Sequence, residues 1–327
     1  MKRMKRLAAL LLTALMMALC CVPTFAVSRK YDTYAVLGDS IAAGYMLPGY
    51  KFGGRKNAAW KVTKNSYPWH IANAVGAKKT YQMAHGGYRT SDLRLILDDN
   101  YKGDFINGRR LPSVGDTLVV DREALAKLKK DFRENISKAD LITLNIGSND
   151  ATQAFAVLLE LVDDDISILQ AQAQMGLDPL TNLGYTLAHA IELTTNSIYA
   201  ARLAKLEVDA FTGFRSNFDT IISEILKLNS HAKLVVMGVY NPVEVASIDT
   251  LLTNIQFGQV LNPVMDIFNN YMEYSSPYRN KYTYVDMRNI ETYVGIGQID
   301  ANPDILMDAH PTLKGHKQMA DQVLAVL

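Results

Sequence analysis

The sequence contains five short apolar runs that are rich in β-branched and aromatic residues, and most of them end in Gly, Asn or Asp, as buried strands commonly do. These runs are residues 34–37, 80–84, 141–146, 233–239 and 282–285. Helical spacing occurs between them, most clearly over 122–138, where Leu125, Leu128, Phe132 and Ile136 recur every three or four residues. Strands that alternate with helices predict an α/β fold with a parallel sheet covered on both faces. Because ligands of such sheets bind beyond the carboxyl ends of the strands, the residues that follow each run are the candidates for a site.

Two segments are longer than ordinary connections between such elements. Residues 46–65 contain four Gly or Pro residues and five basic residues, so they form either a solvated loop or a basic rim for an anionic substrate. Residues 151–229 are mostly helical in pattern. We expect them to form a helical insertion that packs against the active end of the sheet, where it could act as a lid.

The N-terminus has the pattern of an export signal. Four of the first six residues are basic, and an apolar run follows over residues 7–19. That run is shorter than the roughly 20 apolar residues that span a bilayer. Because Thr24, Phe25 and Ala26 suit a signal peptidase, we expect residues 1–26 to be a signal peptide and 27–327 to be one secreted, extracellular domain. Lipid anchoring at Cys20 or Cys21 is the alternative, although a small residue precedes neither of them at the position that such a site requires.

Composition excludes several other classes of function. Both cysteines lie in the expected signal peptide, so the mature chain would have no disulfide, no thiolate metal ligand and no cysteine nucleophile. Removal of the four basic residues from the total of 34 leaves 30 basic against 33 acidic residues. A near-neutral chain lacks the basic excess that is typical of nucleic-acid binding.

Polar clusters follow several of the predicted strands. Gly38-Asp39-Ser40 follows the first run, His85-Gly86-Gly87 follows the second, and Gly147-Ser148-Asn149-Asp150 follows the third. Asp308-Ala309-His310-Pro311-Thr312 lies near the C-terminus. A Gly-Asp-Ser triplet alone is also an ordinary turn with a helix cap. Four clusters at one end of one sheet, however, predict a shared site.

In order and position these four blocks resemble the GDSL/SGNH hydrolases, and the resemblance covers nearly the whole mature chain. Asn241-Pro242, after the fourth run, is also similar to members of that family. The resemblance implies a three-layer α/β/α fold with a five-stranded parallel sheet, of the flavodoxin-like SGNH type. It also implies hydrolysis of carboxylic esters of lipid or carbohydrate without a cofactor or a metal.

The resemblance assigns a role to one residue of each block. Ser40 would be the nucleophile, and its backbone N–H would be one donor to the oxyanion. Gly87, five residues before Asp92, would supply a second N–H, with Gly86 as the alternative. The side-chain amide of Asn149 would be the third donor, and His310 would be the general base. Such a set suits acyl transfer, because the base activates the hydroxyl and the donors stabilise the charge on the attacked carbonyl.

This sequence departs from the family pattern at two positions. Ile41 stands where the motif has leucine, an apolar exchange that should affect packing only. The acid of the last block usually lies three residues before the histidine, where this chain has Met307. Asp308, two residues before His310, is the expected acid, since residues two apart can project to one side of an extended segment. Asp304 and a backbone carbonyl are the alternatives.

The kind of activity, the substrate and the oligomeric state stay open at this point. The chain could be a non-catalytic carbohydrate- or surface-binding module on the same fold, or an acyltransferase to an alcohol. Its substrate could be a small molecule or a polymer, at a membrane surface or a cell wall, and the oligomeric state is open. Of the other histidines, His316 is expected to be structural, whereas His85 adjoins the second block and is a candidate substrate contact.

Overall fold

The computed structural model describes residues 31–50, 61–103, 105–106, 109–110, 122–151, 197–241, 247–249, 254–292 and 310–327. All of them belong to one compact unit, Tyr31–Leu327. The expected signal peptide, and with it the boundary after Ala26, lies outside the described residues. None of the helices that the structure describes is long and apolar enough to cross a membrane.

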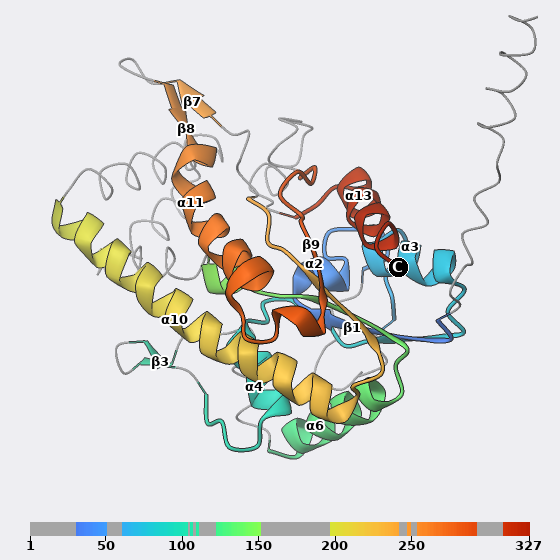
Figure 1. Ribbon diagram of the computed structural model, residues 1–327. Helices are drawn as coiled ribbons and strands as arrows, with labels where there is room; N and C mark the ends of the chain where they lie inside the picture. The colour runs from blue at the N-terminus through green and yellow to red at the C-terminus, as the bar shows by residue number, and fades with distance from the viewer. Residues whose placement is uncertain are drawn as a thin grey trace, which may run out of the picture. The chain divides into compact units, whose positions relative to one another are not determined.

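A five-stranded parallel sheet lies at the centre of this unit (Figure 1). Its strands are β1 (Thr33–Gly38), β2 (Lys79–Gln82), β5 (Leu141–Asn145), β6 (Lys233–Met237) and β9 (Thr283–Val285). Each of them coincides with one of the five predicted runs to within a few residues, so the predicted strands are confirmed. Two short antiparallel pairs complete the strands: β3 (Phe105–Ile106) with β4 (Arg109–Arg110), and β7 (Ser247–Asp249) with β8 (Asn254–Gln256).

The order of the strands across the sheet is β2-β1-β5-β6-β9. The chain therefore moves outward from β1 to β2, and then returns to add β5, β6 and β9 on the other side of β1. This is the flavodoxin-like order, in which a crevice opens between the two strands at the reversal. Those two strands are β1 and β5, which pair in a register that places Gly38 opposite Asn145.

Helices cover both faces of the sheet, as the sequence predicts. They are α2 (Ser40–Ala43), α3 (Tyr67–Val75), α4 (Thr90–Leu97), α6 (Arg122–Ser137), α10 (Ser197–Leu228), α11 (Phe257–Asn270) and α13 (Leu313–Leu324). A π-helical turn, η1 (Tyr271–Ser275), and a 3-10 turn, η2 (Arg279–Lys281), connect α11 to β9. The predicted helix over 122–138 is α6.

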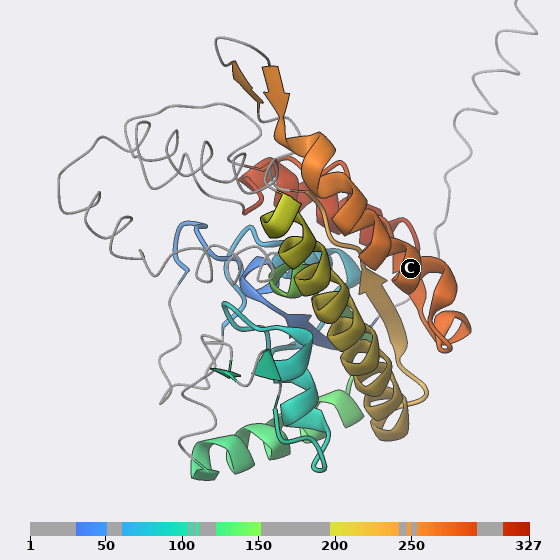
Figure 2. The same cartoon turned by 90° about the vertical axis from the view of Figure 1, so that its left-hand side faces the viewer.

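The alternation of side chains along each strand separates two hydrophobic clusters. In β1, Ala35 and Leu37 belong to the cluster that α4, α6, α10 and α11 cover, whereas Tyr34 and Val36 belong to the cluster of α2, α3 and α13. The other central strands alternate in the same way. A strand buried on both faces needs apolar residues at every position, which explains the continuous apolar runs in the sequence. Figure 2 shows α10 and α11 beside the sheet from a second direction.

Helix α10 differs from the expected insertion. Its residues Phe214, Phe218, Ile221, Ile222 and Ile225 are completely buried in the cluster on one face of the sheet. The C-terminal half of α10 is thus part of the covering layer and not of an added lid. Residues 152–196 of the expected insertion, and residues 51–60 of the expected basic loop, lie outside the described residues.

Gly38 is a position where the close pairing of β1 and β5 excludes a side chain. Its φ is +154°, and an added Cβ would lie 2.3 Å from the backbone oxygen of Asn145 and 2.8 Å from the Cβ of Ala42. We expect Gly38→Ala to lower the free energy of unfolding by about 3 kcal/mol, because such overpacking typically costs 1–3 kcal/mol and the left-handed backbone adds strain. Urea unfolding followed by circular dichroism measures this loss.

Gly76→Ala is the matched control. Gly76 also has a left-handed φ, +69°, but nothing lies within 4 Å of an added Cβ. The free energy of unfolding of this variant should fall only by the roughly 1–2 kcal/mol that the left-handed conformation costs a residue with a Cβ. Equal losses in the two variants would contradict the contact between the strands.

Candidate active site

Ser40 is the first residue of α2 and follows directly on β1. Asp39, the cap of this short helix, is buried, and its Oδ1 accepts a hydrogen bond of 2.9 Å from the backbone N–H of Ile41. Gly44 ends the helix in the left-handed conformation, with φ +77°. The strand, the cap and the glycine together place the serine hydroxyl at the carboxyl edge of the sheet.

His310 comes to the same place from the other end of the chain. Its Nε2 lies 2.8 Å from the Oγ of Ser40, although 270 residues separate them in sequence. The segment after His310 is well anchored, since Thr312 caps α13 by accepting from the N–H of Gly315 at 3.0 Å. The Thr312 hydroxyl also donates to a carboxylate oxygen of Glu291 at 2.7 Å. The imidazole is thus held within reach of the serine proton.

Gly86 of the second block lies next to Ser40. A Cβ on Gly86 would lie 3.9 Å from the Cβ of Ser40. Gly87 has a φ of +77°, which favours glycine. The backbone N–H of His85 donates to the oxygen of Gly38 at 3.1 Å, so this segment continues the pairing of β2 with β1. Gly86 is therefore beside the serine, and Gly87 is the next residue in the chain.

Asn149 joins the third block to the second. Its Nδ2 donates a hydrogen bond of 2.9 Å to the backbone oxygen of Tyr88, the residue after Gly87. An amide nitrogen carries two hydrogens, so this bond fixes the orientation of the side chain and leaves one N–H for a ligand. Asn149 is thus joined to the segment that follows Gly87, and the oxyanion roles of Gly87 and Asn149 stay predictions.

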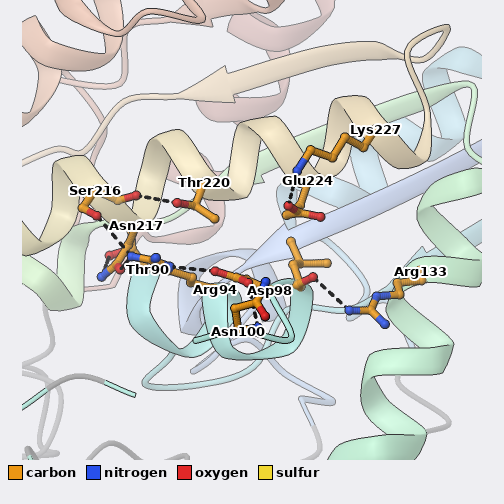
Figure 3. Close-up of polar contacts among 11 residues, drawn as sticks. Thr90, Arg94, Asp98, Asn100, Arg133, Ser216, Asn217, Thr220, Glu224 and Lys227 are labelled. Carbon is orange, nitrogen blue, oxygen red and sulfur yellow. Dashed lines mark hydrogen bonds and ion pairs between the residues drawn. The ribbon is translucent and has the colours of Figure 1, made fainter. Parts of the chain in front are cut away.

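Asp150 adds a second connection that the sequence did not suggest. Its carboxylate accepts from the backbone N–H of Thr90 at 2.9 Å and from the Thr90 hydroxyl, so it holds the start of α4. Asn217 of α10 donates to the same hydroxyl at 3.4 Å and accepts from Arg94 at 3.2 Å (Figure 3). Helix α10 is therefore tied to the loop of the second block. The signal for this link was the Asn149-Asp150 pair itself, in which only the first residue was given a role.

Two buried carboxyl groups lie close to the site. Burial raises the pKa of Asp39 to about 7, although the hydrogen bond from Ile41 and the charge of His310 act in the opposite direction. Burial also raises the pKa of Asp150 to about 6, partly offset by the two bonds from Thr90. Strongly perturbed carboxyl groups in one place are typical of functional sites.

Asp308 and Asp304 lie outside the described residues, as does Pro242 of the Asn241-Pro242 pair. The acid partner of His310 thus stays a prediction. Asn241 is buried after β6, and its Nδ2 donates to Asn262 at 2.8 Å. In the described part of the chain, no group of three or more His, Cys, Asp or Glu residues could hold a metal ion.

The sequence as a whole matches one protein family. The model of the GDSL-like Lipase/Acylhydrolase family matches residues 36–318, which extend from β1 into α13. The chain belongs to this family. It is accordingly an ester-hydrolysing enzyme of the serine hydrolase type. A comparison of the sequence with curated proteins finds no match.

Solved structures of other proteins share the fold of this family member. An extracellular lipase from Streptomyces rimosus is 16% identical with a TM-score of 0.52, over 90% of this chain and 99% of the other. Phospholipase A1 from Streptomyces albidoflavus NA297 is 15% identical with a TM-score of 0.50, over the same shares of the two chains. At such low identity, these similarities establish the α/β/α fold alone.

Two other histidines of this chain, His85 and His316, lie near the site. The ring of His85 stacks on Tyr88 with 5.0 Å between the ring centroids, and its Nδ1 lies 2.9 Å from the oxygen of Gly86. Its contact with substrate stays a prediction. His316 is completely buried in α13, where its Nδ1 accepts from the N–H of Tyr67 at 3.3 Å. The structural role predicted for His316 is thus confirmed.

Burial lowers the pKa of His316 to about 3, with smaller effects of His310 and His70. Between pH 6.5 and 3 the unfolded chain therefore binds a proton at this residue that the folded chain does not. We expect the wild type to lose about 2 kcal/mol of folding free energy at His316 between pH 6.5 and 4.5, and His316→Gln to lack this component. Urea unfolding at the two pH values measures it.

His231 provides the control for this experiment, because it is exposed before β6. His231→Gln should retain the full pH dependence of the wild type. If His316→Gln also retained it, the buried imidazole would not be the group that titrates.

Proposed function

We propose that this family member is an exported serine esterase that cleaves carboxylic esters through an acyl-enzyme on Ser40. The hydrogen bond of 2.8 Å between Ser40 Oγ and His310 Nε2 is the observation that supports this proposal most directly. A serine hydroxyl becomes an effective nucleophile only when a neighbouring base takes its proton, and imidazole is suited to that role near neutral pH.

In the first half of the reaction, His310 Nε2 accepts the proton of Ser40 while Oγ forms a bond to the carbonyl carbon of the ester. The electrons of the carbonyl double bond move to its oxygen. The backbone N–H of Ser40 and of Gly87 and the free N–H of Asn149 stabilise this oxyanion. The loss of one such donor typically costs about 2.7–4 kcal/mol of transition-state stabilisation.

The intermediate then collapses, and the bond to the alcohol oxygen breaks as His310 donates its proton to that oxygen. The alcohol leaves and an acyl ester remains on Ser40. In the second half, His310 takes a proton from water, and the hydroxide oxygen attacks the acyl carbon. The acid departs and the proton returns to Ser40. Asp308 orients the imidazole and stabilises its positive charge in both halves.

Export is the other part of the proposal, and the basic and apolar N-terminal pattern supports it. The expected product in a culture medium begins at Val27, after cleavage behind Ala26. Mass spectrometry of the secreted protein measures its N-terminus. A cell-bound protein with an acylated Cys20 or Cys21 would contradict the proposal and show lipid anchoring instead.

A fluorophosphonate probe tests the nucleophile, because it reacts only with an activated serine. We expect the wild type to be labelled, and Ser40→Ala and His310→Ala to lose labelling and to fall roughly 10⁶-fold in kcat on a 4-nitrophenyl ester. Ser137→Ala is the control, since Ser137 is an exposed serine at the end of α6. An unlabelled, inactive wild type would favour a non-catalytic binding module.

The acid can be identified by paired variants. We expect Asp308→Asn to lower kcat by roughly 10⁴-fold, because an amide stabilises the wrong tautomer of the imidazole. Asp304→Asn should remain close to the wild type. The opposite pattern would identify Asp304 as the acid, and normal activity in both variants would assign the role to a backbone carbonyl. Initial rates over a range of ester concentrations separate kcat from KM.

A further inference from the structure

Tyr45 lies beside His310 and Tyr50 lies beside Tyr45, and neither tyrosine has a role in the reaction described above. The ring centroid of Tyr45 lies 4.7 Å from that of His310, with 48° between the ring planes. The ring of Tyr50 meets that of Tyr45 almost at a right angle, with a centroid distance of 5.3 Å and an interplanar angle of 75°. We call these two residues the aromatic corner.

The aromatic corner adjoins the site on two sides. Tyr45 contacts His310, whereas the hydroxyl of Tyr50 lies 3.8 Å from the position that a Cβ on Gly86 would occupy. The same position is 3.9 Å from the Cβ of Ser40. The corner therefore extends from the base toward the nucleophile.

The backbone holds Tyr45 in a fixed place. Its N–H donates to the oxygen of Ser40 at 3.0 Å, and it lies between two residues in the left-handed conformation, Gly44 with φ +77° and Met46 with φ +66°. A left-handed conformation is unusual for methionine and costs free energy, so the surrounding structure must impose it. Thr63 contributes to this, because its hydroxyl donates to the oxygen of Ala43 at 2.8 Å.

Part of the Tyr45 side chain is nevertheless open to a ligand. Tyr45 is 37% exposed, whereas most aromatic residues of the two hydrophobic clusters are fully buried. A fixed ring that contacts the catalytic base and keeps an accessible surface is suited to contact a substrate. Which end of the substrate it meets follows from the chemistry of the base.

The base gives its proton to the oxygen of the leaving alcohol. That oxygen must therefore come within hydrogen-bond distance of His310 Nε2, and the rest of the alcohol must extend from there along the surroundings of the imidazole. Tyr45 is part of these surroundings. Aromatic rings favour contact with the face or edge of another ring, and two rings at nearly a right angle offer both a face and an edge.

We propose that the aromatic corner is the leaving-group subsite, and that it takes an alcohol with a ring, either an aromatic alcohol or a sugar. This inference rests on the proposed function, because it requires Ser40 and His310 to act on an ester. It concerns the alcohol side alone and makes no statement about the acyl chain.

Three acetate esters test it, since all of them form the same acetyl-enzyme. Phenyl acetate and methyl 6-O-acetylglucoside have a ring in the alcohol, and ethyl acetate has none. We expect Tyr45→Ala to lower kcat/KM about tenfold for the ring-bearing esters, which corresponds to the upper end of the ring–ring contribution of about 0.5–1.5 kcal/mol. For ethyl acetate the change should stay within twofold, and Tyr45→Phe should restore most of the loss on phenyl acetate.

Two controls separate this role from a structural one. Tyr274→Ala removes a tyrosine that is 69% exposed on η1, and it should affect none of the three esters. The rate of fluorophosphonate labelling should be the same in Tyr45→Ala and the wild type, because labelling requires the Ser40–His310 pair and no alcohol with a ring. A lower labelling rate would show that Tyr45 supports the imidazole instead.

The outcomes for the proposed function and for the subsite differ. A wild type that is labelled and hydrolyses all three esters, with the same loss in Tyr45→Ala for each of them, would overturn the subsite alone. Loss confined to phenyl acetate would identify an aromatic alcohol, and loss confined to the glucoside a sugar. A wild type that is neither labelled nor active would overturn both proposals.

Discussion

The parallel pairing of β1 with β5 is the constraint on which the rest of the site depends. Gly38 lies opposite Asn145 so closely that a side chain at Gly38 would meet the backbone of β5. The strand order reverses at this pair, and the crevice that such a reversal opens receives the ends of both strands. Ser40 follows one strand and Asn149 follows the other, so the proposed nucleophile and the proposed oxyanion donor both lie at this edge of the sheet.

Polar contacts then connect the site to the covering helices. Asn149 bonds to the backbone of Tyr88, and Asp150 bonds to Thr90 at the start of α4. Asn217 extends the same network to α10, whose apolar face is buried against the sheet. Preorganised donors are effective in catalysis because they need not reorganise as charge develops. Because α10 is fixed in the core, its bond to Thr90 also fixes the position of the loop that would hold the oxyanion.

The site also concentrates groups that burial perturbs. Burial raises the pKa values of Asp39 and Asp150. It lowers the pKa of His316, which follows His310 in the sequence and lies on α13. Burial shifts the pKa of each of these groups in the direction of its neutral form, because a charge is less favourable there than in water. A weakly polar surrounding strengthens the electrostatic interactions of the few charges that do form there.

The amino-acid sequence by itself determined the strands and the layers, and it named Ser40 and His310, which the structure places in contact. Continuous apolar runs specify buried parallel strands, and since such strands place their carboxyl ends at one edge, the residues after them could be assigned to one site. Local patterns were also sufficient for α6. They failed for the C-terminal half of α10, because a buried helix and an added helical lid have the same apolar periodicity.

Tertiary structure alone decided which side chains contact one another. The approach of His310 to Ser40 spans 270 residues, and nothing in the spacing of the chain fixes a distance between them. The same holds for the contact of Tyr45 with His310 and for that of Asn217 with Thr90. Neither Tyr45 nor Asn217 belongs to a recognisable sequence pattern. Periodicity specifies which face of an element is buried, but a contact between distant segments depends on how whole layers pack, and that is a property of the folded chain.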